Sequence, residues 1–83
     1  MLTVDLFAGV GGFALAADAV GWTPAVSCEI NPFGQTVLRH YWPKAYHHQD
    51  IHTLTGAKIR EEIERRFGSH WSSTDVVLTG GFP

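Results

Sequence analysis

Residues 5–13, DLFAGVGGF, are the stretch that decides the predicted fold of this chain. Its three glycines, Gly9, Gly11 and Gly12, follow a short apolar run and open an alanine-rich segment typical of a helix. A turn without Cβ atoms lets a ligand approach the backbone, and the helix N-terminus behind it attracts anionic groups. The stretch therefore predicts a strand, a glycine turn and a helix that together bind a cofactor.

The rest of the chain continues the same alternation. Four short apolar runs, at residues 2–7, 24–28, 45–49 and 75–79, are separated by three segments of helical length. Apolar strands that alternate with helices are typical of βαβ units, in which helices cover a parallel sheet. We therefore predict an α/β fold, a partial doubly wound parallel sheet of about four strands and three helices.

Start and stop signals delimit the three helices. The first helix is expected from near Gly11 to a stop at Gly21. The second begins with Asn31 as its cap, ends before Pro43 and presents an apolar stripe of Phe33, Val37 and Tyr41. The third buries Ile59, Ile63 and Phe67 and ends at Gly68, while its charge run, Glu61, Glu62, Arg65 and Arg66, is expected to be a solvated face.

Length and charge limit the classes of function. The 83 residues suffice for one domain, and a net charge of -2 argues against this segment gripping a phosphate backbone alone. A single cysteine, Cys28, excludes an internal disulfide and is interpreted as an inert core residue. Neither a membrane span nor a basic leader is recognisable, so we expect a cytoplasmic protein with no membrane partner.

Two acids follow expected strands and suggest what the cofactor is. At the end of a strand, Glu29 is placed to accept hydrogen bonds from ribose hydroxyls, and Asp50 one from the amino group of adenine. The neighbouring Ile30 and Ile51 offer apolar surface to the base. The alternatives are that Glu29 caps the second helix and that Asp50 closes a turn. Because Gly9 to Ala14 also fits the dinucleotide fingerprint, NAD is a rival ligand.

Other polar and aromatic clusters are given structural interpretations. Alternate residues of a strand point to opposite faces, so His47, His48, Asp50 and His52 are not expected to form a metal site. The three tryptophans lie in expected connections and are interpreted as cover for the sheet edges: Trp22, Trp42 and Trp71.

Four motifs in order resemble those of one enzyme family. DLFAGVGG at 5–12, CEINPF with Glu29, QDI with Asp50 and GGFP at 80–83 are similar to the first four motifs of DNA (cytosine-5) methyltransferases. The resemblance spans essentially the whole chain. It favours S-adenosylmethionine over NAD, because Asp50 and GGFP have no role in the dinucleotide fingerprint.

The resemblance implies a Rossmann-like methyltransferase fold with strand order 3-2-1-4 and S-adenosylmethionine as cofactor. Backbone at the turn would line its methionine portion, Glu29 would hold the ribose, and Asp50 the adenine amino group. The adenine ring would lie among Phe7, Ile30 and Ile51, above a floor closed by Gly81 and Pro83. The expected turn residues are Phe7, Ala8, Gly9, Gly11 and Gly12.

In that family the nucleophilic cysteine follows GGFP directly, so it would come after Pro83. Residues 1–83 are accordingly expected to be the N-terminal cofactor-binding part of a catalytic domain, with no catalytic residue of their own. Such a chain would bind cofactor without methylating, would contact DNA only through missing regions or a second polypeptide, and would self-associate or pair with a complementing methyltransferase fragment. The alternatives are a non-catalytic S-adenosylmethionine-binding module and an NAD-binding half-domain of an oxidoreductase.

Overall fold

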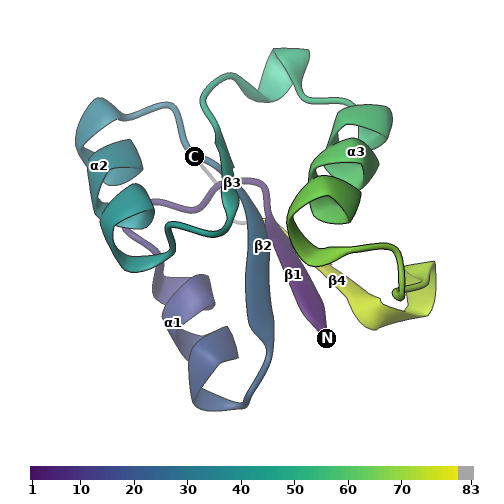
Figure 1. Cartoon of the computed structure of the whole chain (residues 1–83). Helices are drawn as coiled ribbons and strands as arrows, with labels where there is room; N and C mark the ends of the chain where they lie inside the picture. Colours follow the sequence, from purple (N-terminus) through teal and green to yellow (C-terminus); the bar gives the residue numbers. More distant parts are fainter. Residues whose placement is uncertain (81–83) are drawn as a thin grey trace.

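The computed structural model describes residues 1–80, except for the side chain of Ser73. Four strands, three α-helices and two short 3-10 helices alternate along these residues (Figure 1). In chain order the elements are β1 (Leu2–Asp5), α1 (Gly12–Ala19), β2 (Thr23–Cys28), α2 (Pro32–Tyr41), β3 (Tyr46–His48), η1 (Ile51–Thr53), α3 (Gly56–Phe67), η2 (Ser73–Asp75) and β4 (Val76–Thr79).

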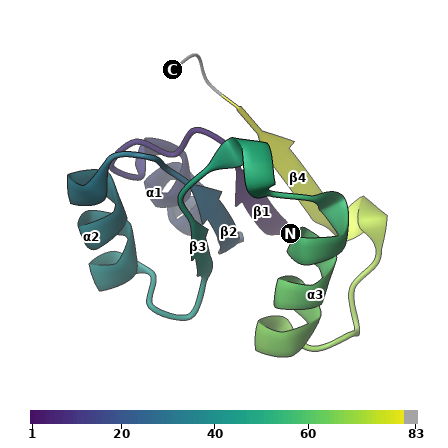
Figure 2. The same ribbon diagram turned by 90° about the horizontal axis from the view of Figure 1, so that it is seen from above.

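The four strands form one parallel sheet in the order β3-β2-β1-β4, which confirms the predicted fold class and strand order. Helices α1 and α2 lie on one face of the sheet and α3 lies on the other (Figures 1 and 2). Asp5 pairs with Ser27 and Thr79, and Cys28 pairs with His48, so the carboxyl ends of all four strands share one edge. No helix within residues 1–80 has the length and apolarity to cross a membrane.

Three of the four strands are shorter than expected, and β2 is one residue longer. Pairing of β1 ends at Asp5 rather than at residue 7, although the Leu6 amide still donates to the Thr79 carbonyl at 2.9 Å. The Ala8 amide then donates to the carbonyl of Cys28 at 3.0 Å, which draws the chain over β2 into the glycine turn. Residues 6 and 7 are therefore the transition from strand to turn.

The apolar core lies between the sheet and α3. Val4, Ala25, Val26 and Ile63 form a buried cluster, and Ile59 and Phe67 pack against it, which confirms the predicted buried stripe of α3. Burial of this stripe is the main source of stability for an amphipathic helix, because each large apolar side chain contributes about 1.5–3 kcal/mol when buried.

The charge run of α3 is exposed at Glu61, Arg65 and Arg66, as expected, but the expectation was wrong at Glu62. Its side chain has 0% exposure and lies 2.9 Å from Lys58 Nζ, 2.6 Å from Arg65 Nη2 and 3.0 Å from Arg66 Nε. Hydrogen bonds from these cations hold the pKa of Glu62 at about 2. Arg66 also donates to the Ala45 carbonyl at 3.1 Å, so the ion cluster ties α3 to the segment before β3.

The expected apolar stripe of α2 was also wrong. Phe33 and Tyr41 are 70% and 67% exposed, whereas the buried positions are Gly34, Gln35 and Leu38. The reason is polar: Gln35 Nε2 donates to the carbonyls of Glu29 at 2.6 Å and His48 at 2.7 Å. Satisfying these strand-end carbonyls fixes the rotation of α2 about its axis. Its limits are as predicted, since Asn31 Oδ1 caps the Phe33 and Gly34 amides and the helix ends before Pro43.

Candidate cofactor site

The glycine turn joins β1 to α1 at the carboxyl edge of the sheet. Gly9 and Gly11 adopt φ angles of +58° and +97°, a region that favours glycine. Gly11 offers no side chain to cap α1, whereas Asn31 caps α2 and Thr55 caps α3. A Cβ atom at Gly9 or at Gly12 would meet nothing within 4 Å, so the turn borders open space. Uncapped amides beside open space suit an anionic group.

Glu29, which follows β2, is hydrogen-bonded directly to this turn. Its Oε1 accepts the Gly9 amide at 2.7 Å and its Oε2 accepts the Asn31 amide at 2.9 Å. The second bond is the helix-capping contact considered as an alternative from the sequence. Each carboxylate oxygen has two lone pairs, so these bonds leave capacity to accept two hydroxyl donors. The carboxylate therefore fixes the turn and remains able to bind a diol.

Asp50 lies at the end of the neighbouring strand. The Glu29 amide donates to the His48 carbonyl at 2.9 Å, which keeps the ends of β2 and β3 side by side. Asp50 Oδ1 accepts the His52 amide at 2.9 Å and caps η1, so the turn-closing contact is also present. That bond uses one of the two carboxylate oxygens.

Three apolar residues follow strands at the same edge, two of them directly after these acids. Phe7 is 39% exposed, Ile30 is 70% exposed and Ile51 is partly buried. Uncovered apolar surface beside polar groups is typical of a binding site for a planar ring. Gly81 and Pro83, to which the family resemblance assigns the floor of the site, lie outside the described residues.

The whole chain matches one family of known proteins. The family model for C-5 cytosine-specific DNA methylase matches residues 1–83. The chain belongs to this family. Type II methyltransferase M1.HphI of Haemophilus parahaemolyticus is 33% identical over 78 residues, which are 93% of this chain and 19% of that protein. Type II methyltransferases M.HgiBI and M.HgiCII of Herpetosiphon aurantiacus are each 48% identical over 40 residues, covering 48% of this chain and 9% of each relative.

Family membership confirms the resemblance drawn from the four motifs, and the parallel sheet agrees with a Rossmann-like methyltransferase fold. The chain spans only 19% and 9% of the lengths of these curated relatives. No solved structure matches it.

Two residues that shape the candidate site were missed from the sequence. A Cβ atom at Gly34 would lie 2.8 Å from Glu29 Cγ and 2.8 Å from the Gly9 carbonyl oxygen, so α2 approaches the turn as closely as a glycine allows. Gln35, one residue on, links the strand ends that carry Glu29 and Asp50. A glycine inside a predicted helix is unfavourable without a packing reason, and that signal could have found Gly34.

Two buried groups lie beneath the site. Asp5 is 4% exposed, burial raises its pKa, and its Oδ2 has no hydrogen-bond partner within residues 1–80. Cys28 is 2% exposed, and burial, followed by the charges of Asp50 and Glu29, raises the pKa of its thiol. A buried thiol with a raised pKa is a poor nucleophile, which agrees with the interpretation of Cys28 as a core residue.

The histidines of β3 take part in hydrogen bonds within the fold. His47 Nδ1 lies 2.6 Å from Ser27 Oγ, and its Nε2 lies 2.7 Å from the Trp42 carbonyl. His48 Nδ1 lies 2.7 Å from the Tyr46 hydroxyl, and its Nε2 lies 2.7 Å from Thr53 Oγ1. Burial lowers the pKa of His47. In the described part of the chain, no three His, Cys, Asp or Glu residues are grouped to hold a metal ion.

Proposed function

We propose that this chain is the S-adenosylmethionine-binding portion of a DNA (cytosine-5) methyltransferase, which transfers a methyl group to carbon 5 of cytosine in DNA. One observation carries the proposal: the hydrogen bond between the Gly9 amide and Glu29 Oε1. It joins an acid suited to a ribose with a glycine turn whose helix has no side-chain cap. Family membership supports the same conclusion.

The residues present fit each part of this cofactor. The uncapped N-terminus of α1, with the backbone from Phe7 to Gly12, is suited to the methionine carboxylate. The carboxylates of Glu29 and Asp50 accept hydrogen bonds from the ribose and from the adenine amino group, and the exposed Phe7 and Ile30 provide apolar contact for the base. When bound, S-adenosylmethionine supplies the electrophilic methyl group.

Cytosine has to be activated by a thiolate that attacks carbon 6, so that carbon 5 becomes nucleophilic. Cys28 is buried beneath the sheet edge with a raised pKa, so we propose that the thiolate comes from outside this chain. The residues described here then bind and orient the cofactor. Alone, the chain binds cofactor and does not methylate DNA.

Partners of the chain are proposed from its uncovered apolar face. A groove of about 360 Å³ lies between α1 and β4, lined by Phe13, Val20, Trp22 and Val77 among others. Phe13 and Val20 are 57% and 65% exposed. We propose that the remainder of the catalytic domain covers this face and supplies the contacts to DNA. The isolated chain is then expected to self-associate in analytical ultracentrifugation, and a stable monomer at every concentration would contradict this.

Calorimetric titration tests the proposed cofactor. We expect the chain to bind S-adenosylhomocysteine and not NAD, and Glu29→Ala to weaken binding about 10- to 100-fold, because hydrogen bonds to a charged group contribute about 1.5–3 kcal/mol each. Glu64→Ala, on the exposed surface of α3, is the matched control and should bind as the wild type does.

Glu29 also holds the turn, so its removal could weaken binding by unfolding the chain. Urea unfolding of each variant separates the two effects, and Asp50→Asn provides a second variant at the other strand end. Tight binding of NAD without any response to S-adenosylhomocysteine would contradict the proposal and favour an NAD-binding half-domain of an oxidoreductase.

A further inference from the structure

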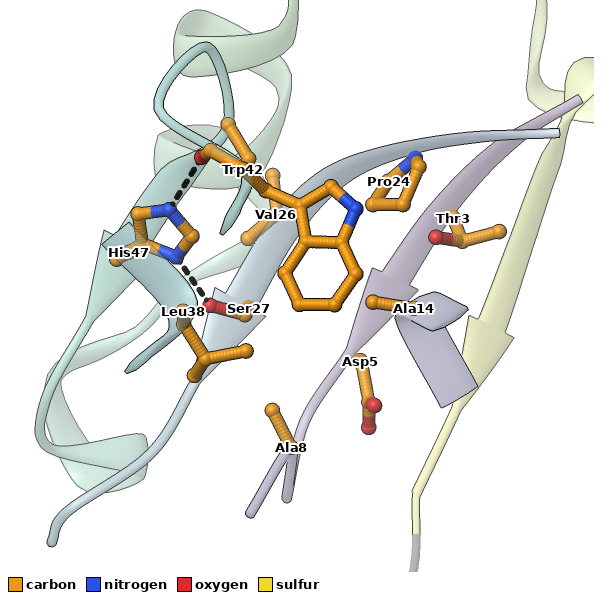
Figure 3. A pocket seen from close by; sticks show the side chains of 11 residues that line it. Thr3, Asp5, Ala8, Ala14, Pro24, Val26, Ser27, Leu38, Trp42 and His47 are labelled. Atoms are coloured by element: carbon orange, nitrogen blue, oxygen red, sulfur yellow. Dashed lines mark hydrogen bonds between the residues drawn. The ribbon is translucent and has the colours of Figure 1, made fainter. Parts of the chain in front are cut away.

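Trp42, the C-terminal cap of α2, fills the space between α1 and the sheet. Figure 3 shows its indole ring lying over β2 and directed toward Ala14. The strand residues that line this space include the polar Thr3, Asp5 and Ser27 besides Pro24 and Val26. The cavity that remains beside the ring has a volume of only about 10 Å³. The indole thus fills this layer together with Leu38 of α2, beside alanines and short polar residues.

The indole packs directly against the backbone of Gly11. A Cβ atom at Gly11 would lie 2.6 Å from Trp42 Cζ3 and 2.9 Å from Trp42 Cη2, which is closer than a Cβ atom approaches another carbon. Gly11 is buried with a φ of +97°, and its carbonyl accepts the Leu15 amide at 2.9 Å at the start of α1. The ring therefore touches the point at which the glycine turn becomes a helix.

Both ends of Trp42 are anchored. Its Nε1 donates to Asp18 Oδ2 of α1 at 2.7 Å, and its carbonyl accepts from His47 Nε2 at 2.7 Å. Because Nε2 faces a carbonyl it carries the proton, so Nδ1 of His47 accepts the hydroxyl of Ser27 at 2.6 Å (Figure 3). Trp42 is consequently tied to α1 through its indole and to β3 through its backbone carbonyl.

We propose that Trp42 is a positioning residue, which fixes the glycine turn in the geometry that binds the cofactor. This inference rests on the proposed function, because the turn is taken to hold the methionine portion. Trp42 reaches the ligand only through Gly11, and it is not one of the residues that the sequence motifs identified. The expectation that Trp42 covers a sheet edge was wrong, because the ring points inward over β2.

The first test removes the benzo ring. Trp42→Phe deletes Cζ3 and Cη2 beside Gly11 as well as the Nε1 donor. We expect its affinity for S-adenosylhomocysteine to fall about tenfold, because a displacement of the glycine turn by about 1 Å severely weakens the contacts that it positions. The affinity is corrected for the folded fraction, which urea unfolding measures. Trp22→Phe, at the distal end of α1, is the matched control and should bind as the wild type does. Equal affinities of the two variants would overturn the proposal.

A double-mutant cycle distinguishes positioning from general packing. Gly11→Ala places a Cβ atom against the indole, and Trp42→Phe removes the atoms that it would strike. We expect the double variant to bind at least about threefold more tightly than the product of the two single losses predicts, as residues in contact are coupled. Strictly multiplicative losses would contradict a positioning role.

Two further measurements keep the inference testable if Trp42→Phe fails to fold or if the wild type binds no ligand. Asp18 is exposed, and Asp18→Ala removes the acceptor of the indole Nε1 hydrogen bond, so this variant should bind more weakly. Asp18→Asn keeps an acceptor and should bind as the wild type does. Without any ligand, Asp18→Ala should accelerate amide hydrogen exchange of residues 9–13 and leave β2 unchanged. Failure of wild-type binding alone refutes the proposed function, and unchanged exchange refutes the role of Trp42.

Discussion

Replacing Gly34 with alanine is expected to weaken binding of S-adenosylhomocysteine at least about tenfold and to lower the free energy of unfolding by about 1–2 kcal/mol. The added Cβ atom would lie 2.8 Å from the Gly9 carbonyl oxygen and 2.8 Å from Glu29 Cγ. The backbone oxygen cannot rotate away, so α2 and the turn have to separate. Separation strains the bond between Glu29 and the Gly9 amide, on which the site depends.

Calorimetry and urea unfolding check this prediction together. Gly56→Ala is the matched control, because a Cβ atom at Gly56 meets nothing within 4 Å and the residue lies in the first turn of α3. That variant should keep full affinity and equal or slightly higher stability, since alanine loses less backbone freedom on folding. If Gly34→Ala behaves as Gly56→Ala does, the close approach of α2 has no role in the site.

Replacing Glu62 with alanine is expected to lower the free energy of unfolding by about 2–4 kcal/mol, which is a large part of the stability of so small a domain. The carboxylate, with 0% exposure, is the shared partner of Lys58, Arg65 and Arg66, so its loss leaves three like charges adjacent. It also releases Arg66 from its position beside the Ala45 carbonyl. Urea unfolding measures the loss, and Glu61→Ala, whose side chain is 65% exposed, should cost less than about 0.5 kcal/mol.

The same carboxylate predicts that the free energy of unfolding depends on pH. In the folded chain the pKa of Glu62 is about 2, below its ordinary value of 4.5. A depressed pKa means that the stabilisation is complete above about pH 4.5 and is lost as the pH falls toward 2. The difference in unfolding free energy between the wild type and Glu62→Gln should therefore shrink across this window. A difference that stays constant from pH 7 to pH 3 would show that the ion cluster contributes little.

Local signals account for much of what the sequence predicted correctly. Gly9 and Gly11 require positive φ, Asn31 followed by Pro32 starts α2, and Gly21 follows the end of α1. Each of these positions depends on the conformational preferences of one or two residues, so neighbouring residues suffice to identify it. The places of Glu29 and Asp50 at the carboxyl edge were predicted in the same way, because a residue that follows a strand of a parallel sheet lies at that edge.

Errors arose where partners distant in the sequence decided the outcome. Periodicity predicted that α2 buries Phe33 and Tyr41, but two strand-end carbonyls bind Gln35 and turn the helix the other way. Spacing predicted that Glu62 is solvated, but its position beside Ile63 on the packed side of α3 buries it under its cationic neighbours. Neither the strand carbonyls nor the packed face of α3 is visible in a local pattern.

The sequence by itself determined the α/β class, the glycine turn, the two strand-end acids and the family. These features follow from short motifs whose residues have intrinsic preferences or fixed places in a parallel sheet. Only the tertiary structure decided that Gly34 lies against the side chain of Glu29, that Gln35 joins two strand ends and that Trp42 packs against Gly11. Those contacts join residues on different elements, and their geometry exists only once helices and strands have packed together.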